Sequence, residues 1–163
     1  MTTKNLSQTS APAQHQPNHP HRILVVDDDD EIRRLNTVVL SGSGYKVDAA
    51  ADGSVAWDTL KHNSYDLLVT DHKMPKVTGV ELLKKLRAAR MALPVILVSG
   101  MMPTTELSRH PWLQIDATLL KPYTSDELLA TVKKVLYVAD STPEQAAPPS
   151  NWQDQPTADC LLL

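Results

Sequence analysis

Five polar side chains of this sequence stand where short apolar runs end. They are Asp27, Asp28, Asp71, Ser99 and Lys121, and the runs before them are ILVV, LLVT, VILV and TLL. Buried parallel strands read as continuous apolar runs, and ligands bind at the carboxyl ends of such strands. We therefore expect three carboxylates, a hydroxyl and an ammonium group to share one crevice at the edge of a sheet.

This combination of groups suits phosphoryl chemistry. Crowded carboxylates raise one another's pKa values unless a cation relieves their repulsion. Oxygen ligands favour Mg²⁺, which takes one or two carboxylates and keeps positions for water and phosphate oxygens. Ser99 and Lys121 are suited to hold the other oxygens of a phosphoryl group. The pattern therefore favours phosphoryl transfer onto or off a carboxylate.

Helical segments must connect these strands. Apolar residues recur near helical spacing between the runs, in residues 31–40, 55–62, 80–90 and 125–136. A further helix after Ser99 must end by about residue 109, because Pro111 cannot continue it. Alternating strands and helices with right-handed crossovers predict an α/β fold, a doubly wound parallel sheet with helices on both faces.

The two ends of the chain differ in composition from its middle. Seven of the 12 prolines fall in segments 1–21 and 141–163, whereas all five glycines lie between them. Such polar ends cannot bury enough apolar surface to offset the entropy of ordering them. We expect a disordered N-terminal tail over residues 1–20, one domain over 21–139, and a disordered Pro-rich tail over 140–163.

Composition also excludes several classes of protein. No apolar run approaches the ~18 residues of a membrane span, and the N-terminus lacks the apolar core of a secretory signal. The single cysteine, Cys160, cannot form an internal disulfide. Residues 22–140 carry 15 Lys and Arg against 16 Asp and Glu, which argues against a nucleic-acid-binding face. We expect a cytoplasmic protein that binds neither membrane nor nucleic acid.

The spacing of the motifs matches a known family. The motifs are Asp27–Asp28, Asp71 followed by Met74–Pro75 and Gly79, Ser99–Gly100, and Lys121–Pro122. With these motifs, residues 21–139 resemble the receiver domain of two-component response regulators, of the chemotaxis-regulator-like, stand-alone type. The resemblance implies a flavodoxin-like sandwich of five strand–helix units with strand order 2-1-3-4-5.

The resemblance implies a set of metal ligands. Asp28 and Asp71 would bind Mg²⁺ directly, with the backbone carbonyl of Lys73 as a third protein ligand. Asp27 would act through a bound water molecule. Mn²⁺ is expected to substitute for Mg²⁺.

The resemblance also implies how the domain signals. Asp71 accepts a phosphoryl group from a sensor histidine kinase or a histidine phosphotransfer protein. Lys121 pairs with the phosphoryl oxygens, Ser99 swings in to hydrogen-bond the phosphorylated aspartate, and the Lys121–Pro122 bond is cis. The chain is then a signalling protein rather than an enzyme, a monomer or weak dimer whose phosphorylation switches binding to an unidentified downstream protein.

Some positions depart from the family or have simpler interpretations. Thr118 stands where many receivers carry an aromatic switch residue, and Lys73 and Met101 occupy positions that tune hydrolysis of the aspartyl phosphate. Asp29 and its neighbour Asp30 favour the N-terminus of the first helix rather than metal binding. His72, next to Asp71, is expected to face solvent.

Two other functions stay open. One is a pseudo-receiver that binds proteins without being phosphorylated. The other is a phosphohydrolase similar to haloacid dehalogenases, suggested by the Asp-x-Asp pattern within VVDDDD. Those enzymes place the nucleophile on the first strand and usually carry a cap domain, whereas Asp71 follows the third apolar run.

Overall fold

The computed structural model describes residues 19–101 and 104–141 of the 163-residue chain. The predicted tails, 1–20 and 140–163, lie almost wholly outside these residues, so the tails and the domain boundaries stay predictions. No helix of the described residues is long and apolar enough to cross a membrane.

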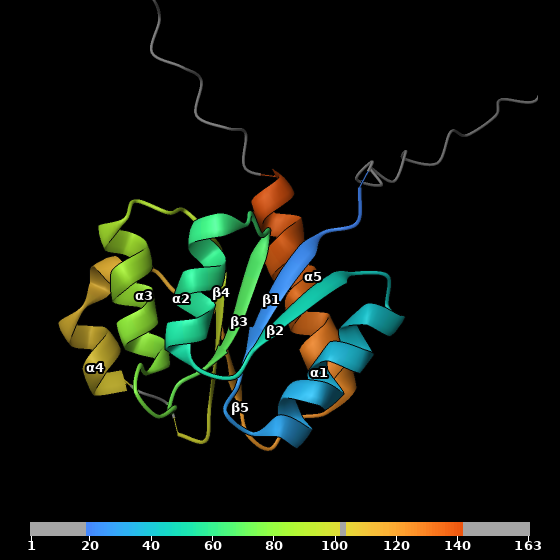
Figure 1. Ribbon diagram of the computed structural model, residues 1–163, viewed down its shortest axis with the longest axis horizontal. Helices are drawn as coiled ribbons and strands as arrows, with labels where there is room; N and C mark the ends of the chain where they lie inside the picture. The colour runs from blue at the N-terminus through green and yellow to red at the C-terminus, as the bar shows by residue number, and fades with distance from the viewer. Residues whose placement is uncertain (1–18, 102–103, 142–163) are drawn as a thin grey trace, which may run out of the picture.

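Five parallel strands form a single sheet (Figure 1), in the order β2-β1-β3-β4-β5 that the resemblance implied. They are β1 (Arg22–Val26), β2 (Lys46–Ala50), β3 (Leu67–Asp71), β4 (Val95–Ser99) and β5 (Ala117–Leu120). The register pairs Val26 with Thr70 and Ser99 with Leu120. The carboxyl ends of β1, β3, β4 and β5 therefore lie along one edge of the sheet.

Helices cover both faces of the sheet (Figure 1). They are α1 (Asp30–Gly42), α2 (Gly53–His62), α3 (Gly79–Ala88), α4 (Thr104–Arg109), the short 3₁₀ helix η1 (Pro111–Leu113) and α5 (Ser125–Ser141). Helices α1 and α5 pack on one face, where Leu40 and Val132 join the core. Helices α2 and α3 pack on the other, with Leu60 and Leu83. The α/β doubly wound fold is thus confirmed.

The core is aliphatic because the chain has no phenylalanine. Every residue of β3 and β4 is buried, as expected for continuous apolar runs covered by helices on both faces. Each buried Val, Leu or Ile side chain contributes about 1.5–3 kcal/mol. This burial holds the strand ends at fixed positions, which a site spread over four strands requires.

Side-chain caps determine where the helices begin. The Asp29 carboxylate accepts hydrogen bonds from the backbone N–H groups of Glu31 and Ile32, so its predicted helix-terminal role is confirmed. At α5 the cap is Thr124, which bonds reciprocally with Glu127. This cap directly precedes Ser125, the first residue of α5.

Helix α4 is short, as predicted: it ends at Arg109, and Pro111 begins η1. Arg87 of α3 holds the chain that follows. Its guanidinium group donates hydrogen bonds to four carbonyl oxygens, those of Leu113 (2.9 Å), Gln114 (2.7 Å), Met91 (2.8 Å) and Leu93 (3.1 Å). Arg87 therefore connects α3 to the segments that enter β4 and β5.

Replacing Arg87 should destabilise the domain. We expect Arg87→Ala to lower the free energy of unfolding by about 2–4 kcal/mol, because four carbonyl groups lose a charged donor at once. Urea denaturation measures the change. Arg34→Ala, at an exposed position of α1, is the matched control and should stay within about 0.5 kcal/mol of the wild type. Equal stability of the two variants would contradict this role of Arg87.

Candidate functional site

Four of the predicted site residues lie together at the carboxyl edge of the sheet. Asp71 and Ser99 are the last residues of β3 and β4, while Asp27 directly follows β1 and Lys121 directly follows β5. Asp27, Asp71 and Ser99 are buried, with 2%, 6% and 2% of their surface exposed. Buried polar groups need partners, so their contacts define what the site can do.

Lys121 joins the two buried carboxylates. Its Nζ lies 2.6 Å from Oδ1 of Asp71 and 3.1 Å from Oδ2 of Asp27. Burial disfavours the charged form of Lys121, but hydrogen bonds with Asp71 and Asp27 outweigh it, so the pKa of Lys121 lies above its usual value. Burial raises the pKa of Asp27, and bonds from the Asp29 amide and from Lys121 oppose this. One cation thus offsets part of the negative charge of two carboxylates that would otherwise repel.

Backbone amides orient the same carboxylates. The N–H of Lys73 donates to Oδ2 of Asp71 at 2.7 Å, and the N–H of Asp29 donates to Oδ1 of Asp27 at 2.9 Å. The side chain of Arg33 donates to the backbone carbonyl of Asp27 at 2.7 Å and so braces the loop before α1. The carboxylates are thus held by fixed dipoles as well as by Lys121.

The structure brings Asp27 and Asp71 together, but Asp28 has an exposed side chain. Among residues 19–101 and 104–141, no three His, Cys, Asp or Glu side chains are grouped closely enough to hold a metal ion. The expected trio of carboxylates is therefore not assembled here, and the ligand roles of Asp27, Asp28, Asp71 and Lys73 stay predictions. The oxygen donors of Asp27 and Asp71 still fit Mg²⁺, which takes only one or two carboxylates.

His72 does not simply face solvent, so that prediction is wrong. Its side chain is half-buried, and its Nδ1 lies 3.3 Å from the Oγ of Ser99. The reason is strand register. Asp71 pairs with Val98, and the N–H of His72 continues this ladder to the Val98 carbonyl at 2.7 Å. The next pair along is His72 beside Ser99, and paired residues place their side chains on the same face.

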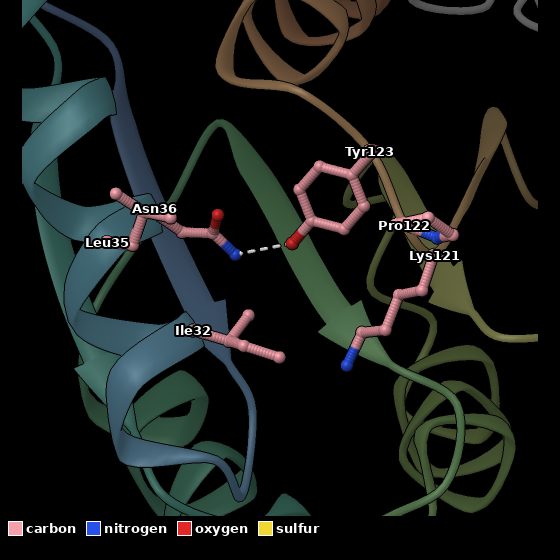
Figure 2. A pocket seen from close by; sticks show the side chains of 6 residues that line it. All are labelled: Ile32, Leu35, Asn36, Lys121, Pro122 and Tyr123. Carbon is pink, nitrogen blue, oxygen red and sulfur yellow. Dashed lines mark hydrogen bonds between the residues drawn. The ribbon is translucent and has the colours of Figure 1, made fainter.

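A pocket of about 410 Å³ lies next to Lys121, between α1 and the loop after β5 (Figure 2). It is lined by Ile32, Leu35, Asn36, Lys121, Pro122 and Tyr123. Figure 2 shows the Asn36 amide donating to the Tyr123 hydroxyl across it, at 2.8 Å. The Lys121–Pro122 bond is cis, as predicted. The sequence pattern indicates no site role for Tyr123 or for the α1 side chains, because apolar residues on a helix indicate core first.

These features define an α/β protein with an Asp–Asp–Lys site at the carboxyl edge of a parallel sheet. The family model "Response regulator receiver domain" matches residues 23–133. The chain therefore belongs to the response regulator receiver domain family of two-component systems, which generally serves signalling rather than catalysis.

Individual relatives agree with this assignment. The response regulator Rre1 of Synechocystis is 38% identical over 120 residues, which cover 72% of this chain and 52% of Rre1. A CheY-like receiver domain protein from Methanospirillum hungatei is similar in structure, with a TM-score of 0.70, 29% identity, and coverage of 74% of this chain and 97% of that one. Response regulator TrrA from Thermotoga maritima, solved with Mg²⁺ and BeF, matches with a TM-score of 0.63, 32% identity, and coverage of 71% and 98%.

The chain spans about half the length of the curated relatives that it matches. The family assignment therefore covers the receiver domain, and what the relatives do as whole proteins does not pass to this chain directly.

Gly79, the first residue of α3, packs against the phosphoacceptor candidate. A Cβ at this position would overlap the backbone carbonyl of Asp71, and the Gly79 N–H donates to the His72 carbonyl at 3.1 Å. We expect Gly79→Ala to lower the free energy of unfolding by about 1–3 kcal/mol, measured by urea denaturation. Gly42→Ala is the control, because nothing lies within 4 Å of its Cβ. A Gly79→Ala variant as stable as Gly42→Ala would contradict this close packing.

Proposed function

We propose that this receiver domain accepts a phosphoryl group on Asp71 and thereby switches its binding to a downstream protein. The observation that carries the proposal is the ion pair of half-buried Lys121 with the buried Asp71, shared with Asp27. A carboxylate that is buried, oriented by the Lys73 amide and next to a fixed cation is suited to be a nucleophile. The family supports the same reaction.

The chemistry follows from the positions of the groups. An oxygen of Asp71 attacks phosphorus, the bond from phosphorus to a donor histidine nitrogen breaks, and the nitrogen keeps the electron pair. Lys121 can follow the developing negative charge, because it already contacts Oδ1 of Asp71. Bound Mg²⁺ would neutralise phosphoryl oxygens, and Asp27, Asp28, Asp71 and the carbonyl of Lys73 are the residues proposed to hold it. The Mg²⁺–BeF complex of TrrA supports this choice of ion.

The switch would then act through Ser99. Its hydroxyl is proposed to move toward the phosphorylated Asp71 and alter the surface beyond β4. Thr118 of β5 is half-buried and small, so an aromatic side chain does not transmit this movement at that position. We propose output through a protein partner, with the chain acting in the cytoplasm as a monomer or weak dimer.

A chemical phosphodonor tests the proposal. Incubation with acetyl phosphate and Mg²⁺ should add one labile phosphoryl group, seen in the intact mass. The adduct should disappear in Asp71→Asn and when Mg²⁺ is chelated, because both nucleophile and charge neutralisation are required. Asp126→Asn, at an exposed carboxylate of α5, is the matched control and should phosphorylate like the wild type.

The same experiment separates the alternatives. A folded protein that gains no adduct would instead be a pseudo-receiver. Repeated turnover of phosphomonoesters that depends on Asp27 would indicate a phosphohydrolase.

We also propose where the phosphodonor docks. The pocket beside Lys121 is mostly apolar, and Leu35 at its rim is 57% exposed. A histidine that delivers a phosphoryl group to Asp71 must approach the Lys121 ammonium group, so its own domain must cover neighbouring surface. The occupant we favour is therefore an apolar face of the sensor histidine kinase or histidine phosphotransfer protein that donates the phosphoryl group.

Substitution at the pocket should affect phosphorylation by a protein donor but not phosphorylation by acetyl phosphate. We expect Leu35→Glu to slow phosphoryl transfer by at least about tenfold when the donor is a phosphorylated kinase that modifies the wild type. The reason is that a buried charge opposes docking. Phosphorylation by acetyl phosphate should not change. Val38→Glu, on the same helix and 61% exposed, lies outside the pocket and is the control. Equal kinase rates for both variants would refute docking there.

A further inference from the structure

The Ser99 hydroxyl is fully engaged away from Asp71. Its proton goes to the backbone carbonyl of Met101, and its oxygen accepts the Met101 N–H at 3.2 Å. Its third partner is Nδ1 of His72, at 3.3 Å. A serine hydroxyl offers one proton and two lone pairs, so these three bonds use its whole capacity.

The single proton of the Ser99 hydroxyl determines which group donates in the hydrogen bond between His72 and Ser99. Because the single Ser99 proton is given to Met101, the oxygen can only accept from His72, and Nδ1 of His72 must carry a hydrogen. His72 therefore carries a hydrogen on Nδ1 while this bond is made. The bond is directional and fails if the ring carries its proton on Nε2 alone.

The backbone fixes His72 in this position. Its N–H extends the β3–β4 ladder to Val98, and its carbonyl accepts the N–H of Gly79. Its ring is half-buried on the face that Ser99 occupies. The residue after the proposed phosphoacceptor is thus tied at both backbone groups, and its side chain reaches the residue proposed to switch.

We propose that His72 is a positioning residue that retains the Ser99 hydroxyl in its resting place and opposes its movement to phosphorylated Asp71. This inference rests on the proposed function, because it concerns regulation of the same site. For Ser99 to donate to a phosphoryl oxygen, its proton must leave the Met101 carbonyl. The bond from His72 must then break or re-form at a new position. His72 therefore sets what fraction of molecules is switched.

The resting protein provides the first test, with no phosphodonor present. Nitrogen-15 NMR of the wild-type His72 ring should show hydrogen on Nδ1. In His72→Phe, the amide resonance of Met101, whose N–H bonds to Ser99, should move toward the chemical shift that it has in the switched protein. His72→Asn keeps an N–H donor where Nδ1 lies and should restore the wild-type resonance. A ring with hydrogen on Nε2 alone overturns the proposal, and this measurement needs no variant.

A phosphoryl mimic provides the second test. Beryllium fluoride with Mg²⁺ should bind His72→Phe about three- to tenfold more tightly than the wild type, the range expected for one lost hydrogen bond. His72→Asn should bind like the wild type. In a Ser99→Ala background the effect of His72→Phe should vanish, because the partner is gone. Equal or weaker binding to His72→Phe, or the same gain without Ser99, overturns the proposal.

The outcome of these tests can be distinguished from the outcome of the acetyl phosphate experiment, which tests the proposed function. A wild-type protein that gains no adduct from acetyl phosphate contradicts phosphoryl transfer to Asp71. The state of the His72 ring and the Met101 resonance still decide whether His72 holds Ser99.

Discussion

The contact of Lys121 with the buried carboxylates of Asp71 and Asp27 is the interaction on which the rest of the site depends. Two carboxylates at the end of a buried sheet would repel each other if no cation stood between them. Lys121 provides that cation at 2.6 Å and 3.1 Å. It can do so only because β5 ends where β1 and β3 end, which the parallel register ensures. The fold therefore serves mainly to bring three distant parts of the sequence to one point.

The surroundings of this contact hold it in place from several directions. Asp29 caps α1 and also donates its amide to Asp27, so one residue fixes both the helix and the carboxylate. The Asn36–Tyr123 bond joins α1 to the loop that carries Lys121. Gly79 lets α3 begin against the backbone of Asp71. The proposed movement after phosphorylation is therefore expected on the remaining side of the site, where Met101 and His72 hold Ser99.

Much of this could be predicted from the sequence, because buried parallel strands and helix-breaking prolines leave plain local patterns. The strand ends, the short α4 and the helix-terminal role of Asp29 are confirmed. The contact of His72 with Ser99 could not be predicted, because it depends on the pairing of β3 with β4, residues far apart in sequence. The exposure of Asp28 was missed for a similar reason: identical neighbours in a turn differ only in the direction of their side chains.

The most direct test of the central claim is chemical mapping of the phosphorylated residue. Borohydride reduces an aspartyl phosphate to homoserine, which peptide mass spectrometry locates. After treatment with a phosphodonor and Mg²⁺, we expect homoserine at position 71, and a loss of this product when Lys121 is replaced by Ala. Homoserine at Asp27 or Asp28, or a phosphoryl group on another residue type, would contradict the account of Asp71 as the acceptor beside Lys121.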